Sequence, residues 1–172
     1  MVADNGIDPI LMDFGSLSPS PIVAASRSIA LEIQDTAAEH STMPYRAPEL
    51  FDVKTDSIID TKTDIWSLGC TMFACLVGKS PFEMRSEETG GSLSLAILGG
   101  DWRFPDEAAP GKKGVIKGSG IISPEIKKII RVCLRVEPSE RPDINVVLRM
   151  LNYAQQASAS DESASRPTMQ NA

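Results

Sequence analysis

The sequence predicts a mainly α-helical fold in which other helices pack around one buried helix. Residues 63–78 carry no charged side chain between Asp64 and Lys79, and apolar or small residues occupy every face of a helix drawn through them. Such a helix is buried on all sides or lies in a membrane, and this one is shorter than the roughly 20 apolar residues needed to cross a bilayer. Several other helical stretches and a single convincing strand support the same fold class.

Local signals place elements before and within the buried helix. Residues 9–12 predict a strand, whose partner is either residues 1–8, in a short N-terminal β-hairpin, or a segment elsewhere. A Ser- and Pro-rich loop over 16–28 precedes a short helix over 29–39, and Pro48 suits the start of a helical turn. Asp64 stands where a carboxylate interacts with the free N–H groups of a helix start.

The second half of the chain predicts three more helices. Residues 80–83 predict a turn and residues 85–91 an exposed loop, after which Ser92 caps a short helix that ends at Gly99. Residues 106–120 predict a surface loop. Ser123, followed by a proline and an acid, begins a helix whose apolar stripe contains Ile126, Ile129, Ile130, Cys133 and Leu134. Asp143 is expected to cap the last helix.

Composition limits the function classes. The predicted domain covers residues 1–153, and residues 154–172 have too little to bury and predict a disordered tail. A net charge of -6 excludes a general nucleic-acid-binding surface. The three cysteines lack metal-ligand spacing and predict buried free thiols. With no signal peptide, membrane-spanning run or myristoylation start, the expected location is cytoplasmic.

Four short motifs occur in one order along the chain. They are Asp13-Phe14-Gly15, then Thr42-Met43-Pro44-Tyr45-Arg46-Ala47-Pro48-Glu49, then Asp64-Ile65-Trp66-Ser67-Leu68-Gly69, and finally Glu140-Arg141-Pro142. In this order they resemble the C-terminal lobe of a eukaryotic protein kinase over about residues 7–151. The finer pattern resembles the Numb-associated kinase family, in particular its lipid-anchored serine/threonine kinase branch.

The resemblance implies roles for the residues at the start of the motif series. Asp13 would hold the Mg²⁺ that bridges the phosphates of ATP, because a hard cation prefers carboxylate oxygen. Phe14 would pack against the opposite lobe, and Gly15 would let the backbone turn. Residues 16–46 would form the activation segment, with phosphorylation candidates Ser26, Ser28, Thr36 and Ser41.

The resemblance implies that residues of the later motifs shape the substrate site and support it. Thr42 would bond the catalytic aspartate and favour serine/threonine specificity, and Tyr45 belongs to the same substrate pocket. Glu49 would form a buried ion pair with Arg141, and Asp64 would accept backbone hydrogen bonds from the catalytic loop. The partners implied are ATP, Mg²⁺ and a protein substrate.

Several kinase parts have no counterpart in this sequence. There is no Gly-rich loop, no strand lysine with its partner glutamate, and no His-Arg-Asp loop, so the catalytic aspartate is absent. One interpretation is a piece of a non-specific serine/threonine protein kinase, inactive alone, with membrane association only through a missing N-terminus. The alternatives are a non-catalytic kinase-like binding module and a helical domain with no retained role. The oligomeric state stays open.

Overall fold

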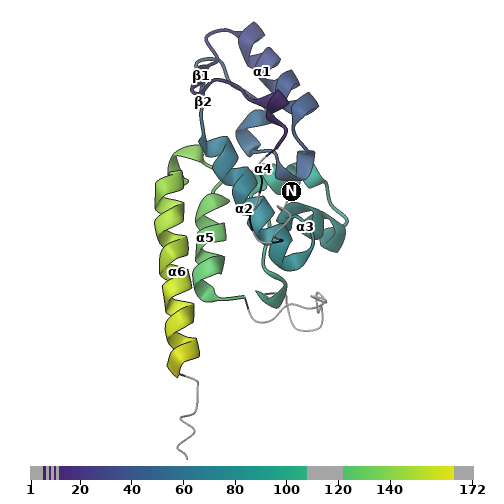
Figure 1. Ribbon diagram of the computed structural model, residues 1–172. Coiled ribbons are helices and arrows are strands. Elements are labelled where there is room, and N and C mark those ends of the chain that lie inside the picture. Colours follow the sequence, from purple (N-terminus) through teal and green to yellow (C-terminus); the bar gives the residue numbers. More distant parts are fainter. Residues whose placement is uncertain (1–5, 7, 9, 11, 108–121, 165–172) are drawn as a thin grey trace, which may run out of the picture.

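The computed structural model describes residues 6, 8, 10, 12–107 and 122–164, with side chains described up to residue 157 (Figure 1). Within these residues the fold is mainly α-helical, as predicted. The α-helices are α1 (Arg27–His40), α2 (Lys62–Val77), α3 (Pro81–Thr89), α4 (Leu93–Gly99), α5 (Pro124–Cys133) and α6 (Ile144–Ala164). The strands are β1 (Ile22–Val23) and β2 (Ile58–Ile59), and the short 3₁₀ turns are η1 (Phe14–Ser16), η2 (Met43–Tyr45), η3 (Pro48–Leu50), η4 (Pro105–Glu107) and η5 (Pro138–Glu140).

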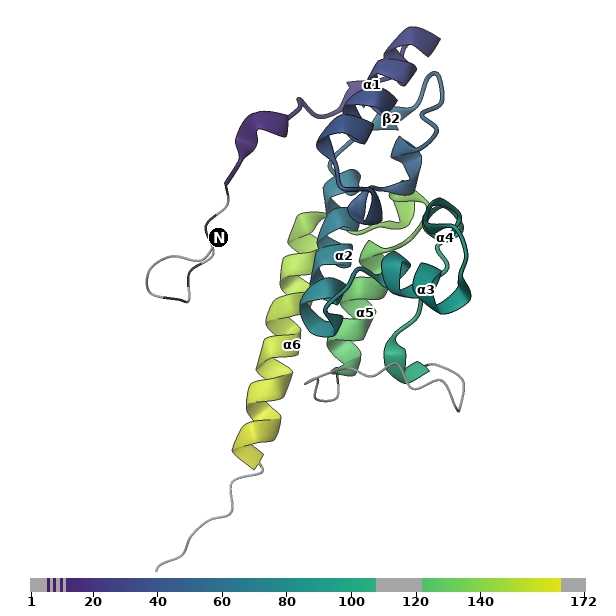
Figure 2. The same cartoon turned by 90° about the vertical axis from the view of Figure 1, so that its right-hand side faces the viewer.

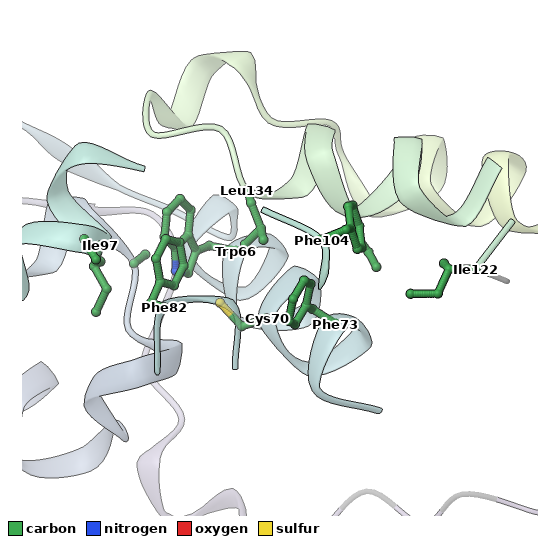
Figure 3. Packing of buried hydrophobic residues seen from close by; sticks show 11 residues of the cluster. Trp66, Cys70, Phe73, Phe82, Ile97, Phe104, Ile122 and Leu134 are labelled. Atoms are coloured by element: carbon green, nitrogen blue, oxygen red, sulfur yellow. The ribbon is translucent and has the colours of Figure 1, made fainter. Parts of the chain in front are cut away.

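Helix α2 is the centre of the main hydrophobic core. Its Trp66 ring stacks on Phe82 of α3, with ring centroids 5.2 Å apart, and its Phe73 ring lies 5.3 Å from Phe104 (Figure 3). Ile97 of α4 and residues of α5 complete the cluster. Offset and edge-to-face aromatic pairs contribute beyond their buried area, so this cluster fixes α3 and α4 on α2.

Helices α2 and α5 approach closely at Gly69. A Cβ atom at this position would lie 2.8 Å from Cβ of Cys133 and 3.0 Å from Cδ2 of Leu134. Glycine is therefore required by the distance between the two helices. A second core on the same side joins Ile65 of α2 to Ile129 of α5 and Val147 of α6.

The prediction that α2 is buried all round is wrong for one face. Thr71, Cys75 and Leu76 are exposed, and Leu76 retains 36% of its accessible surface. Helices α3 to α6 cover the other faces, while no described residue covers this one. The predicted burial of all three cysteines fails at Cys75 for the same reason.

Helix α3 replaces the predicted turn and exposed loop. Ser80 Oγ accepts from Glu83 N at 3.1 Å, and the Glu83 carboxylate accepts from Ser80 N at 3.2 Å. This reciprocal capping box stabilises the start of α3, a helix that the polar composition of these residues did not predict. At α5 the predicted start is confirmed, because Ser123 Oγ accepts from Ile126 N at 3.3 Å. Ser92 precedes α4 as predicted but makes no side-chain cap bond.

The described sheet lies outside the N-terminal hairpin, which was one of the two alternatives for residues 9–12. Strands β1 and β2 pair antiparallel, with Ile22 opposite Ile59 and Val23 opposite Ile58. Residues 9 and 11 of the predicted strand, and residues 1–5 and 7 of its proposed partner, lie outside the described residues. Ile10 and Met12 belong to neither helix nor strand. The two strands and α1 share a small separate core of Ala24, Ala30, Val53 and Ile59 at one end of the molecule (Figure 1).

Helix α6 differs from the predicted tail. It continues to Ala164, because its alanine and glutamine residues favour helix and Ala154 is buried against the second core. Residues 165–172 and residues 108–120 of the predicted surface loop lie outside the described residues. Among the described helices, none has the length and apolar character to cross a membrane.

Candidate active site

The Asp13-Phe14-Gly15 motif lies on a segment that projects from the helices (Figure 2). Asp13 has a left-handed backbone, with φ 64° and ψ 69°, and it precedes the 3₁₀ turn η1. Asp13 is exposed, and the Phe14 side chain keeps 57% of its surface accessible. The left-handed residue is therefore Asp13, a residue type that tolerates this backbone, whereas the resemblance implied that Gly15 would let the backbone turn.

The chemistry of Asp13 fits one ligand of a magnesium ion. Mg²⁺ keeps several waters and typically takes one or two protein carboxylates together with substrate phosphates. The exposed Asp13 carboxylate offers such an oxygen donor. Among the described residues, no group of three or more His, Cys, Asp or Glu side chains is placed to hold a metal ion.

Helix α1 occupies the middle of the predicted activation segment and is capped at both ends. Ser26 Oγ accepts from Ile29 N at 3.3 Å at its start. At its end, Arg46 Nε donates to Ser41 Oγ at 2.8 Å, and Arg46 Nη2 donates to the Ser41 carbonyl at 2.9 Å and the Ala38 carbonyl at 3.2 Å. A cation on the last carbonyls of a helix stabilises that end.

The structure separates the four phosphorylation candidates by environment. Ser26 is half-buried at the helix start, and its Oγ lies 2.9 Å from Ser28 Oγ. Ser28 and Thr36 are exposed on α1. Ser41 is half-buried beyond the helix end, where its hydroxyl donates to the Ala37 carbonyl and accepts from Arg46.

The turn that carries Thr42 and Tyr45 is held against α2. Ser67 Oγ of α2 donates to the Tyr45 carbonyl at 3.0 Å, and Tyr45 N donates to the Thr42 carbonyl at 2.9 Å. Burial raises the pKa of the half-buried Tyr45 above its usual value, and the Glu83 carboxylate adds to the shift. The exposed Thr42 hydroxyl makes no hydrogen bond with any described residue, so it is free to meet another group.

Glu49 and Arg141 meet in a buried bidentate ion pair, as the resemblance implied. Arg141 Nη1 donates to Glu49 Oε1 and Arg141 Nη2 to Glu49 Oε2, both at 2.7 Å. The remaining guanidinium hydrogens reach three backbone carbonyls, those of Lys62 at 2.9 Å, Arg135 at 2.8 Å and Val136 at 2.9 Å. All five guanidinium donors are thus used, and the group also lies 5.0 Å from the Trp66 ring centroid.

Asp64 has a different environment from the one a complete kinase lobe would give it. It lies in the first turn of α2, where a carboxylate is favourable, but it does not cap the helix, which begins at Lys62. Its side chain is exposed, and no described residue forms a hydrogen bond or ion pair with its carboxylate. The group implied to hold the catalytic loop therefore faces solvent.

The sequence did not reveal several residues whose hydrogen bonds hold the motif-bearing segments in place. Lys62 Nζ donates to the Arg141 carbonyl at 2.8 Å and to Asp143 Oδ1 at 2.6 Å, so Asp143 pairs with a base as well as preceding α6. Arg46 and Ser67 were inside quoted motifs but had no assigned role. Their partners are distant or backbone groups, and only the Ser-x-x-Glu pattern of Ser80 and Glu83 was a detectable local signal.

Comparison with known proteins gives a consistent assignment. The chain is 39% identical to the serine/threonine-protein kinase ppk13 of Schizosaccharomyces pombe over 152 residues, which is 88% of this chain and 40% of that protein. It is 34% identical to the human serine/threonine-protein kinase 16 over 155 residues, 90% of this chain and 46% of that protein. It is also 34% identical to the serine/threonine-protein kinase ENV7 of Saccharomyces cerevisiae over 143 residues, 83% of this chain and 36% of that protein.

The chain therefore spans less than half of the length of these curated relatives. A family model described as the protein kinase domain matches residues 9–151. This range contains all four motifs and the Glu49–Arg141 pair that joins two of them. The chain belongs to the protein kinase family.

Proposed function

We propose that this chain forms the C-terminal part of the catalytic domain of a serine/threonine kinase. The observation that carries the proposal is the clamped segment 42–49, held to α2 by Ser67 and to the core by Arg141. A rigid platform beside an exposed Thr42 suits the positioning of a protein substrate, and phosphoryl transfer depends mainly on positioning and charge neutralisation. The names of the relatives support the serine/threonine class.

The proposed cofactors are ATP and Mg²⁺, and Asp13 is the proposed ligand of the Mg²⁺. Bound Mg²⁺ would neutralise charge that develops on the transferred phosphoryl group. The exposed Asp13 carboxylate would hold it, as the Asp13-Phe14-Gly15 motif suggests. Asp64, exposed and without a described partner, is available to receive backbone N–H groups of a catalytic loop. The residue patterns quoted above support the finer proposal, membership of the lipid-anchored branch of the Numb-associated kinases.

An activity assay on two preparations tests the proposal. The 172-residue chain alone should transfer no phosphate from labelled ATP to casein, because it carries no catalytic aspartate. Fusing the part of the fission-yeast relative that precedes the matched region to this chain should restore transfer, and Asp13→Ala should abolish it in the fusion. A folded fusion that binds ATP but transfers no phosphate would contradict the proposal. It would instead favour a non-catalytic binding module.

We further propose that phosphorylation at the two ends of α1 has opposite effects. A dianion on Ser26 would lie at the positive end of the helix dipole, beside Arg27. One on Ser41 would lie at the negative end, replace the hydroxyl that donates to the Ala37 carbonyl, and compete with the Ala38 and Ser41 carbonyls for Arg46. Ser26→Glu should raise the helix content measured by circular dichroism, and Ser41→Glu should lower it. Equal changes in both variants would contradict the argument.

A further inference from the structure

A groove outside the motif site runs between α5 and α6. It has a volume of about 420 Å³, with Glu125, Lys128 and Ile129 on the α5 side and Arg149, Met150 and Tyr153 on the α6 side. The two helices lie side by side in Figure 1 and Figure 2. None of the four kinase motifs contributes a residue to it.

The groove has an apolar base and exposed walls. Ile129 is 1% exposed and belongs to the core shared with α2, and Met150 packs against the same core. Tyr153 keeps 69% of its surface accessible, and Lys128 and Arg149 are exposed. A pocket for a small molecule encloses most of its ligand, which these exposed walls do not do. The shape instead suits apolar side chains of a larger partner whose body remains outside.

The groove walls carry two bases without a partner among the described residues, and the other described bases of this kind, Arg27 and Arg135, do not line the groove. Neither Lys128 nor Arg149 forms an ion pair or side-chain hydrogen bond with any described residue. By contrast, Lys127 and Arg131 on α5 form ion pairs with Asp106 and Glu107. Lys128 on α5 and Arg149 on α6 line the same groove, and two cations without a described partner at one groove can pair with the acids of a binding partner.

One acid also lines the groove. Glu125 lies in the first turn of α5, where the helix dipole stabilises a carboxylate. One carboxylate against two cations leaves an excess of positive charge. The groove therefore complements a partner that carries acids beside its apolar side chains.

We propose that the α5–α6 groove binds an acidic amphipathic helix of a protein partner. Apolar residues at i, i+3, i+4 and i+7 of that helix lie over the accessible Val146, Met150 and Tyr153, which is a common mode of helix-in-groove recognition. Its carboxylates pair with Lys128 and Arg149. The surface is separate from the proposed catalytic site, so a partner bound here leaves the segment 42–49 accessible.

Fluorescence anisotropy with two synthetic peptides tests this proposal on the full chain. The probe is a fluorescein-labelled peptide of repeated Leu-Glu-Glu-Leu-Leu-Glu-Glu heptads, and its control replaces each glutamate with lysine. The acidic peptide should bind, more weakly as salt rises, and the basic peptide should not. The double variant Lys128→Glu with Arg149→Glu should lower the affinity by about tenfold or more, as expected when two favourable charge contacts become repulsive.

The matched control is Arg135→Glu, which reverses another exposed base outside the groove. It should bind the acidic peptide as the unchanged chain does, and all variants should show the same thermal unfolding. Equal binding of the acidic and basic peptides, or unchanged affinity in the double variant, would overturn the proposal. So would binding to phosphatidylserine vesicles through Lys128 and Arg149 without binding of the acidic peptide, because the groove would then recognise a membrane.

Discussion

Replacing Arg141 with alanine removes the guanidinium group that holds Glu49, and with it the segment 42–49, against the core. The Arg141 side chain is fully buried, and the Glu49 side chain is 15% exposed. In Arg141→Ala, the Glu49 carboxylate keeps its buried position but loses both of its hydrogen bonds, which come from this one residue. The carbonyls of Lys62, Arg135 and Val136 lose their donors at the same time.

The expected loss of folding stability follows from the burial of the Glu49–Arg141 pair. Removing one partner of a buried ion pair costs about 3–5 kcal/mol, because the remaining charge stays in a poorly solvated site. For a chain of this length, each kcal/mol lowers the melting temperature by roughly 2–4 °C, so the expected fall is roughly 6–20 °C. Arg149→Ala removes an exposed side chain without an ion pair, and its effect should stay within about 0.5 kcal/mol.

Circular dichroism during heating gives the melting temperatures of Arg141→Ala and Arg149→Ala, and urea denaturation gives their free energies of unfolding. Arg141→Lys should lie between the unchanged chain and Arg141→Ala, because lysine keeps the charge but not the bidentate geometry. The double variant Glu49→Ala with Arg141→Ala should lose less stability than the sum of the single variants. Equal melting temperatures for Arg141→Ala and Arg149→Ala would refute the reasoning.

Three further outcomes are expected. Ser80→Ala removes the capping box of α3 and should cost about 1 kcal/mol by urea denaturation, whereas Ser92→Ala should cost little because Ser92 makes no cap bond. Gly69→Ala forces a contact between α2 and α5 and should cost about 1–3 kcal/mol, whereas Gly99→Ala meets open space in α4 and should not destabilise. Cys75 should be the single thiol that iodoacetamide labels at pH 8 in the folded chain, with all three labelled in denaturant; fast labelling of Cys75→Ser would contradict this.

The thiol prediction depends on the environments of the other two cysteines. Burial raises the pKa of Cys133 to about 11 and raises that of Cys70 as well, with the Arg141 charge opposing both shifts only in part. At pH 8 both side chains are therefore protonated as well as inaccessible. A raised pKa lowers the thiolate fraction throughout the range below it, so their labelling should stay slow until the chain unfolds.

The sequence predicts α2 and α5 well because their signals are local. The apolar stripe from Ile126 to Leu134 and the cap at Ser123 lie within one helix, and most of the stripe is buried. Helix α3 escapes this reasoning because acids and Arg85 dominate it, and its stability comes from its capping box and from Phe82 packing on Trp66. The strands escape because two-residue pairings carry too little periodicity.

The features of the candidate site also differ in whether a local sequence pattern predicts them. The pairing of Glu49 with Arg141, 92 positions apart, came from resemblance, since no local pattern connects them. Which face of α2 its neighbours leave uncovered could not be predicted, because an apolar helix carries no local signal for it. Arg46 at the end of α1 had no local signal either, since its acceptors are mainly backbone carbonyls.

The small core beneath α1 has a consequence for motion. Ala24, Ala30, Val53 and Ile59 hold α1 and the two strands together, and α1 contacts the rest of the chain through the η3 turn and through Arg46 at its end. Such a unit can open as one cooperative foldon while the helices around α2 remain closed. Amide hydrogens of α1 should therefore exchange through sub-global opening, well before those of α2 and α5, whose exchange requires unfolding of the main core.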